Sequence, residues 1–252
     1  MNQERRNQIV DILNKKGTIS NNEIITTFGV SIETVRRDLA FLEERGYCER
    51  VYGGAVRKKF MNVEPEYLNR EKENLSEKQV IANEGAKLIS NGDTVFFDLG
   101  TTVQLLAHKL DADKDIIAFT NALRTAITLS DKGKKVFIPG GELREGEYAV
   151  SGSFSEDCMN NFNIDKAFIG VGGINENGIS DFIISEARLR SKIIKNARKV
   201  IALADFSKFG VCAMCNVCKV EDIDVLITDD KAPIEVLREL EKKGVQVIVA
   251  KE

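Results

Sequence analysis

From Ser76 onward, the sequence alternates between helix-length segments and short runs that are rich in β-branched and aromatic residues. We expect about seven strands, at 94–97, 116–119, 135–138, 166–171, 200–203, 225–228 and 245–249. Helices are expected between most of them, notably at 102–110, 122–130, 183–197 and 233–243. Parallel strands need a long crossover connection, usually a helix. The alternation therefore predicts an α/β fold, with a largely parallel sheet and helices on its faces.

Small and polar residues follow several of these predicted strands. Ligands of parallel sheets bind beyond the carboxyl ends of the strands, where loops lead into helix N-termini. The segment 98–102, DLGTT, follows the first strand and opens a helix, so its glycine, N–H groups and two hydroxyls favour an anion. The other clusters at strand ends are Thr120 with Asn121, Gly140 with Gly141, Gly172 with Gly173, and 205–208. We expect these ends to meet at one rim, although each cluster alone also fits a turn, an N-cap or a surface charge.

The segment 31–46 has the pattern of a short amphipathic helix. Ser31 stands at the N-cap position, and Gly46 stands where a helix commonly ends. The apolar residues that recur at helical spacing are Ile32, Val35, Leu39 and Leu42. At about 100° per residue they share one face, which leaves Arg37 nearly opposite, Thr34 on the exposed flank and Arg36 near the rim of the packed face.

Further elements are predicted on both sides of this helix. Ser20 and Glu23 form an S-x-x-E capping box for a preceding helix, and Gly29 supplies the tight turn between the two helices. A first helix is expected at 5–16. Downstream, two short extended runs within 48–58 flank a Tyr-Gly-Gly turn, which predicts a small β-hairpin, or wing.

The run 30–56, VSIETVRRDLAFLEERGYCERVYGGAV, closely resembles the signature of the DeoR family of bacterial sugar-operon repressors. The resemblance implies that the second helix of the motif enters the DNA major groove. The residues that it places at the groove are Thr34, Arg36 and Arg37, and those that it places along the DNA backbone or minor groove are Arg50, Tyr52, Gly53 and Gly54. The family usually has histidine before the two glycines, and the phenol of Tyr52 can still donate to a phosphate. The alternative interpretation is a solvated arginine face with an ion pair to Asp38 or Glu33.

The clusters at the strand ends resemble the C-terminal domain of the same family, which shares its fold with ribose 5-phosphate isomerase and binds a phosphorylated sugar. The resemblance implies that Gly100, Thr101 and Thr102 hold the phosphate and that Lys208 adds a positive charge. The residues that it places at the sugar hydroxyls are Asp98, Asn121, Glu186 and Asp205. The expected effector site is completed by Thr120, Gly140 and Gly141.

A division into two domains is expected from these patterns. Residues 1–59 form a winged helix-turn-helix DNA-binding domain, 60–75 form a linker, and 76–252 form the effector domain, which a capping box of Ser76 and Gln79 opens. Residues 1–59 contain 11 Lys and Arg against 8 Asp and Glu, whereas the whole chain has a net charge of -3. A positive domain joined to an acidic body suits contact with nucleic acid phosphates.

The apolar runs and the cysteines of the sequence bear on the cellular location of the protein and on metal binding. No apolar run approaches the roughly 20 residues of a membrane span, so we expect a cytoplasmic protein without a membrane partner. Cys212, Cys215 and Cys218 form C-x-x-C-x-x-C, which fits a zinc or iron–sulfur site, but no fourth ligand lies nearby. Three buried small residues are the favoured interpretation, and no metal or cofactor is expected. His108 is expected on a helix surface.

Three functions remain open on these grounds. The favoured one is a repressor that binds double-stranded operator DNA as a homodimer or homotetramer and is released by a phosphorylated sugar. The second is a phosphosugar isomerase with Glu186 or Asp205 as proton-transferring carboxylate and Lys208 as electrophile. A DNA-binding scaffold without an effector is the third. The predicted winged helix argues against the phosphosugar isomerase. The phosphate-type loop argues against a DNA-binding scaffold without an effector.

Overall fold

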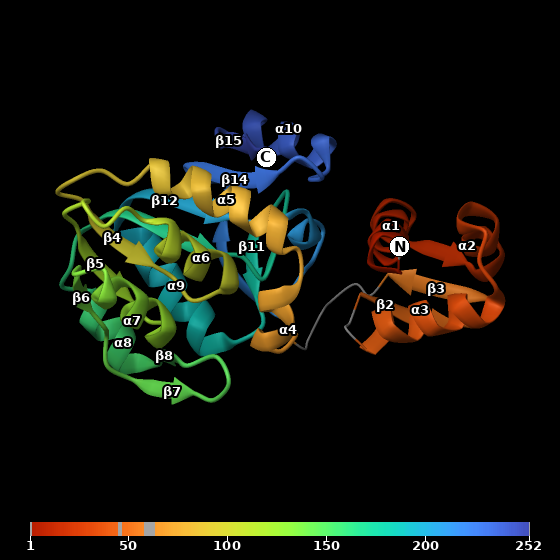
Figure 1. The fold of residues 1–252 in the computed structure, drawn as a ribbon, viewed down its shortest axis with the longest axis horizontal. Coiled ribbons are helices and arrows are strands. Elements are labelled where there is room, and N and C mark those ends of the chain that lie inside the picture. The colour runs from red at the N-terminus through yellow and green to blue at the C-terminus, as the bar shows by residue number, and fades with distance from the viewer. Residues whose placement is uncertain (1, 45–46, 58–63, 252) are drawn as a thin grey trace. The chain divides into compact units, whose positions relative to one another are not determined.

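A computed structural model describes residues 2–44, 47–57 and 64–251 (Figure 1). The chain divides into two compact units, Met1–Pro65 and Glu66–Glu252, which we term the headpiece and the sensor unit. Residues 66–75, which the sequence places in a linker, lie in the sensor unit and include α4 (Tyr67–Lys72). Tyr67 is buried there, so this segment packs against the sensor unit.

The headpiece combines helices with a small antiparallel sheet. Its helices are α1 (Asn2–Lys16), α2 (Asn21–Phe28) and α3 (Ile32–Glu44). The strands β1 (Thr18–Ser20), β2 (Cys48–Val51) and β3 (Gly54–Arg57) pair in the order β1-β3-β2. The predicted helices and wing are present, whereas β1 was not predicted because a three-residue strand carries no readable alternation. The core is formed by Ile9, Leu13, Ile19, Ile24, Val35, Leu39, Leu42, Cys48 and Ala55.

The turn between α2 and α3 follows the sequence prediction closely. The Ser20 hydroxyl accepts from the N–H of Glu23 at 3.1 Å, and Gly29 ends α2 in the left-handed conformation at φ 63°. Ser31 caps α3 by accepting from the N–H of Thr34 at 3.3 Å. The Glu23 carboxylate pairs with Lys16. Gly46, the predicted end of the helix, lies outside the described residues.

The sensor unit is built on a seven-stranded sheet in the order β15-β14-β12-β9-β4-β5-β6, and all its neighbouring strands are parallel. The strands are β4 (Thr94–Phe97), β5 (Ile117–Thr120), β6 (Lys135–Phe137), β9 (Ile164–Gly170), β12 (Ala197–Leu203), β14 (Val225–Asp229) and β15 (Gln246–Ala250). They coincide with the predicted strands to within a few residues at each end. The α/β prediction is therefore confirmed.

Two apolar cores cover the two faces of this sheet. Successive side chains of a strand point to opposite faces, so Phe96 belongs to one core and Val95 and Phe97 belong to the other. Helices α5 (Leu75–Lys87), α6 (Thr101–Lys109) and α7 (Leu123–Asp131) contribute to the core that contains Phe97. Helices α8 (Ser153–Met159), α9 (Ile184–Asn196) and α10 (Ile234–Lys242) contribute to the other (Figure 1).

Smaller elements of the sensor unit differ from the predictions. The hairpin of β7 (Glu142–Arg144) and β8 (Ala149–Ser151) and the sheet of β10 (Gly173–Asn175), β11 (Gly178–Asp181) and β13 (Cys215–Lys219) were not predicted. The capping box of Ser76 and Gln79 was wrong, because α5 begins at Leu75 and has Asn74 as its N-cap. Short 3₁₀ turns, η1 (Phe206–Lys208) and η2 (Val220–Asp222), complete the unit.

Candidate nucleic-acid interface and effector site

Helix α3 presents two arginines to solvent. Arg36 and Arg37 are exposed, and within residues 2–44, 47–57 and 64–251 neither has an ion-pair partner. Asp38, which the alternative interpretation paired with them, is buried and pairs with Arg5 and Arg6 of α1, each at 2.7 Å. That alternative was therefore wrong for Asp38. The buried pairs fix α3 against α1 and leave the two α3 arginines available for a phosphate or a base edge.

Backbone geometry requires glycine at two positions of the wing. Tyr52 stands fully exposed in the turn, and Gly53 follows at φ 88°, where a side chain would be strained. A Cβ at Gly54 would lie 2.1 Å from the carbonyl oxygen of Ile19, so the approach of β1 requires glycine. Arg50 forms a 2.6 Å ion pair with Glu43 of α3.

At the carboxyl end of β4, the chain turns directly into α6. Gly100 is the N-cap at φ 131°, a conformation that other residues rarely adopt. Thr101 and Thr102 open the helix and are buried. The first N–H groups of a helix have no partner within it, so this loop offers donors and a positive dipole end to an anion.

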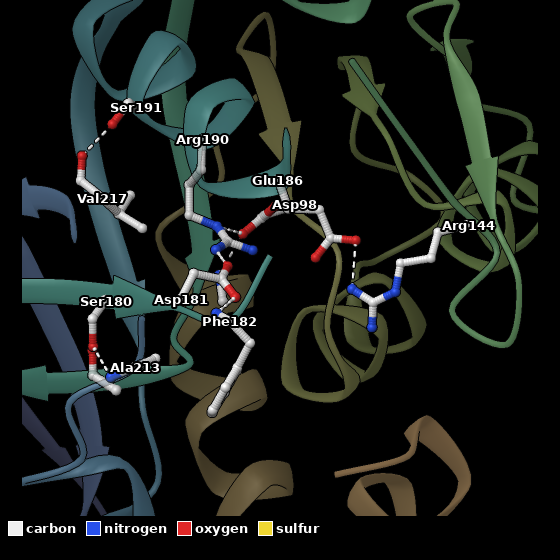
Figure 2. A network of polar contacts seen from close by, with 12 residues as sticks. Asp98, Arg144, Ser180, Asp181, Phe182, Glu186, Arg190, Ser191, Ala213 and Val217 are labelled. Atoms are coloured by element: carbon white, nitrogen blue, oxygen red, sulfur yellow. Dashed lines mark hydrogen bonds and ion pairs between the residues drawn. The ribbon is translucent and has the colours of Figure 1, made fainter. Parts of the chain in front are cut away.

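Asp98, at the start of the same loop, is engaged by the protein itself. Its Oδ2 accepts from the N–H of Gly170 at 3.0 Å and from Nε of Arg190 at 2.5 Å (Figure 2). Arg190 also pairs with Asp181, and all three charged side chains are buried. Burial raises the pKa of Asp98 above its ordinary value, while Arg190 opposes this change. Asp98 therefore has a structural role that the sequence did not indicate.

A chain of ion pairs runs from α9 through the β7–β8 hairpin to α4. Glu186 accepts from Arg144 at 2.7 Å (Figure 2). Arg144 also lies 3.4 Å from Glu147, which pairs in turn with Arg70. Of these residues the sequence indicated only Glu186. The others were missed because they are distant in sequence and belong to elements that were not predicted or were assigned to the linker.

The ends of β5 and β6 are shaped by backbone contacts. Thr120 and Asn121 are buried, and the Thr120 hydroxyl accepts from the N–H of Ala122 at 3.1 Å. The Asn121 carbonyl accepts from the N–H of Val150 at 2.7 Å, whereas its side-chain Oδ1 has no partner in the described part of the chain. A Cβ at Gly141 would lie 2.5 Å from the carbonyl oxygen of Ser151. Gly140 accepts from Ser155.

Two lysines approach the end of β12. Asp205 caps η1 by accepting from the N–H of Ser207 at 3.0 Å, and Lys208 ends this turn, half-buried. Lys78 of α5 is buried and donates to the carbonyl of Arg70. Burial, together with the charges of Lys208 and Arg70, lowers the pKa of Lys78 to about 8 against the opposing charge of Asp205. Lys78, which the sequence did not indicate, thus adds a cation near Lys208.

The structure also places the remaining candidates, the cysteines and His108. The cysteines are free, and among the described residues no group of His, Cys, Asp and Glu could hold a metal ion. Cys215 and Cys218 lie on β13, and burial raises the pKa of Cys218 to about 12. His108 is exposed beside Gln104 on α6. No helix in the described part of the chain is long and apolar enough to cross a membrane.

Family models match both units of this chain. The DeoR-like helix-turn-helix domain matches residues 5–59, and the DeoR C terminal sensor domain matches residues 73–230. The chain belongs to the DeoR family. A putative aga operon transcriptional repressor of Escherichia coli O157:H7 is 34% identical to this DeoR-family chain over 99% of the chain and 94% of its own length. The transcriptional repressor GlcR of Bacillus subtilis is 36% identical over 99% and 97%.

The similarity to solved structures is weaker. Ribose 5-phosphate isomerase A of Methanocaldococcus jannaschii aligns with a TM-score of 0.41 and 16% identity, over 54% of this chain and 55% of the other. A similarity of this size carries no argument about a ligand. The similar DeoR-family proteins are transcriptional regulators, so this chain is a regulator with a DNA-binding domain and a sensor domain, and not an enzyme.

Proposed function

We propose that this DeoR-family chain represses a sugar-utilisation operon and leaves its operator when a phosphorylated sugar binds the sensor unit. The glycine-led start of α6 and Lys208 both follow the carboxyl ends of strands, and these strands belong to one parallel sheet. This observation carries the proposal. A helix N-terminus and a lysine at the same edge of the sheet together favour a phosphate monoester over a neutral sugar.

On the DNA side, the exposed arginines of α3 support reading of the major groove. Arg37 and Arg36 are candidates for contacts to guanine or phosphate, with Thr34 beside them. Tyr52, at the tip of the wing, would meet the DNA backbone, and so would Arg50 on β2, the strand that leads into the same turn. Gly53 and Gly54 contribute by shaping the turn.

On the effector side, the residues have different roles. Gly100, Thr101 and Thr102 would hold the phosphate. Within residues 2–44, 47–57 and 64–251, Asn121 Oδ1 and Asp205 Oδ2 are buried and have no partner, which suits sugar hydroxyl donors. Glu186 and Asp98 act through the arginines that they bind, and Thr120, Gly140 and Gly141 shape the strand ends.

A homodimer or homotetramer belongs to this proposal. One winged-helix module buries too little surface for tight specific binding, and paired half-sites reflect a two-fold symmetric protein. Sedimentation at micromolar concentration tests this point. A monomer that retains tight operator binding would contradict it.

The experiment that tests the function selects an operator from random DNA and then measures its affinity for the protein. Glucose 6-phosphate, fructose 6-phosphate, ribose 5-phosphate and glycerol 3-phosphate are added in turn, and turnover of each is assayed in parallel. We expect one of them to weaken operator binding by roughly 5- to 150-fold, a typical range of allosteric coupling, without turnover. Operator binding that none of the four changes, or turnover of any of them, would overturn the proposal.

A further inference from the structure

Helix α4 is the first element of the sensor unit after the headpiece, and polar contacts hold it at the effector side. Its Arg70 pairs with Glu147 of the segment that joins β7 and β8. Just beyond it, Asn74 Nδ2 donates to Asp205 Oδ1 at 3.2 Å. Tyr67 is buried, with its ring 4.7 Å from the guanidinium of Arg124. The segment that was read as a linker therefore borders the proposed effector site (Figure 1).

On this helix and on the segments linked to it, several buried polar atoms have no hydrogen-bond partner among the described residues. They are the Tyr67 hydroxyl, Asn121 Oδ1, Arg124 Nε, Glu147 Oε2 and Asp205 Oδ2. More than about 90% of buried polar groups in proteins have a hydrogen-bond partner, so a cluster of exceptions needs a physical explanation. The side chains of Tyr67, Asn121, Glu147 and Asp205 are all at least 94% buried. Their oxygens are therefore held away from bulk water.

These residues are joined to α4 by direct contacts or through their neighbours in the chain: Arg124 contacts Tyr67, Glu147 pairs with Arg70, and Asp205 bonds to Asn74. Arg124 lies between two aromatic rings, 4.7 Å from Tyr67 and 4.7 Å from Tyr148. Tyr148 follows Glu147, the partner of Arg70, and its carbonyl accepts from the residue before Arg124. We term Tyr67, Asn121, Arg124, Glu147 and Asp205 the α4 cluster.

The backbone is strained at two positions beside this cluster. Among the described residues, the non-glycine residues with positive φ are Asn74, at 52°, and Tyr148, at 53°. Asn74 bonds to Asp205, and Tyr148 stacks on Arg124. Sparsely populated backbone conformations persist where the surrounding structure enforces them, and they concentrate at ligand sites and switches. The strained backbone positions thus lie beside the buried polar atoms that have no partner among the described residues.

We propose that the effector site extends from the strand ends to α4, and that the Tyr67 hydroxyl and Arg124 bind the effector directly. This inference rests on the proposed function and adds the element that senses occupancy. An effector that bonds both to Tyr67 on α4 and to Asp205 or Asn121 on the sheet would tie α4 more tightly to the sensor unit. Because α4 is the first helix that follows the headpiece in the chain, it is the element of the sensor unit through which occupancy would act on DNA binding.

The chemistry of the cluster defines the class of effector. Asn121, Glu147 and Asp205 offer three acceptors, which match the hydroxyl donors of a polyhydroxy chain. Arg124 Nε offers a donor for a ring, carbonyl or phosphate oxygen. This pattern favours a phosphorylated sugar with several free hydroxyls over glycerol 3-phosphate, which has two.

The test compares two conservative variants that differ in one respect. Tyr67→Phe and Tyr148→Phe each remove one hydroxyl from a ring that stacks on Arg124, but the hydroxyl of Tyr67 is the one that is buried and unpartnered. Calorimetry measures the affinity of each full-length protein for glucose 6-phosphate, fructose 6-phosphate, ribose 5-phosphate and glycerol 3-phosphate. We expect Tyr67→Phe to weaken the tightest of these by about five-fold and Tyr148→Phe to leave it unchanged, as one hydrogen bond predicts.

Amide hydrogen exchange of residues 67–72 supplies the second measurement. The tightest-binding sugar phosphate should slow exchange of α4 in the wild type, and it should do so less in Tyr67→Phe. Equal affinities in both variants, or unchanged exchange of α4 in the liganded wild type, would overturn the inference and leave the proposed function standing. Failure of all four sugar phosphates to bind the wild type would overturn the proposed function, and the inference with it.

Thermal melting separates this role from a structural one. Removal of a buried hydroxyl that has no partner should leave the melting temperature of Tyr67→Phe at or above that of the wild type. A lower melting temperature would mean that the hydroxyl has a partner within the protein or a trapped water, which contradicts the inference.

Discussion

The carboxylate of Asp98 and the guanidinium of Arg190 form a buried ion pair with 2.5 Å between Oδ2 and Nε, although 92 positions separate them in the sequence. The pair joins the loop after β4 to α9, and Asp181 of β11 contacts the same guanidinium (Figure 2). One arginine thus holds together three elements, namely the loop after β4, α9 and β11. The geometry of the phosphate-type loop depends on this contact.

Arg190→Ala should destabilise the sensor unit strongly, because it leaves the carboxylates of Asp98 and Asp181 buried without their cation. Breaking a buried pair on one side costs about 3 to 5 kcal/mol. The matched control is Arg198→Ala, whose exposed pair with Asp165 at 3.2 Å should contribute at most about 1 kcal/mol. Urea unfolding measures both free energies. Similar losses in the two variants would contradict the role given to Arg190.

Arg37→Ala should abolish specific operator binding and leave the fold intact, because the side chain is exposed and unpaired within the described residues. A bidentate arginine–guanine contact provides about 1 to 3 kcal/mol of discrimination, so preference for operator over scrambled DNA should fall with affinity. Fluorescence anisotropy against both DNAs measures this, and Arg198→Ala again serves as the control. Affinity of the wild type should also decline steeply with salt. Unchanged binding to both DNAs would remove Arg37 from the interface.

Thr101→Glu and Lys208→Ala should each weaken binding of the sugar phosphate, the first by repulsion of the anion and the second by loss of a cation. Operator binding without effector should be nearly unaltered, so both variants would repress permanently. The measurement is operator affinity with and without the effective sugar phosphate. A Lys208→Ala protein that responds as the wild type does would exclude this rim as the effector site.

Asp229 should make stability depend on pH. Burial and, to a smaller extent, the charge of Asp205 raise its pKa from the ordinary 3.8 to about 6, against the opposing effect of the N–H groups of Phe206 and Lys231. The native state then binds the proton more tightly than the unfolded state, so the contribution of Asp229 is greatest below pH 4 and is lost as pH rises through 6.

Comparison of the wild type with Asp229→Asn isolates this effect. Between pH 5 and pH 7.5, the free energy of unfolding of the wild type should fall relative to the variant by about 1 kcal/mol. Urea unfolding at several pH values provides the measurement. A difference between the two proteins that does not vary with pH would show that the Asp229 pKa is near its ordinary value.

Local patterns in the sequence were sufficient for the main elements. The strands of the large sheet are short apolar runs between helices, and both features depend on neighbouring residues. The α2–α3 turn was predictable for the same reason, because Ser20, Gly29 and Ser31 act within three or four residues of their own positions. Elements with weak local signals were missed, such as β1 and the β7–β8 hairpin.

The roles of individual site residues were decided by tertiary structure. The sequence placed the carboxylates of Asp98 and Glu186 at a strand end and a helix start. No local pattern indicates that Arg190 and Arg144 would form ion pairs with them. In the same way, Tyr67 and Lys78 lie in or next to a segment that has no strong periodicity, yet both are buried beside the rim. Hydrogen bonds and ion pairs between distant segments depend on how whole elements pack, and a local pattern carries no information about that packing. The sequence by itself therefore determined the strands, the helix-turn-helix and the loops that could bind an anion, while the packing of the sheet and helices determined which charges remain available to a ligand.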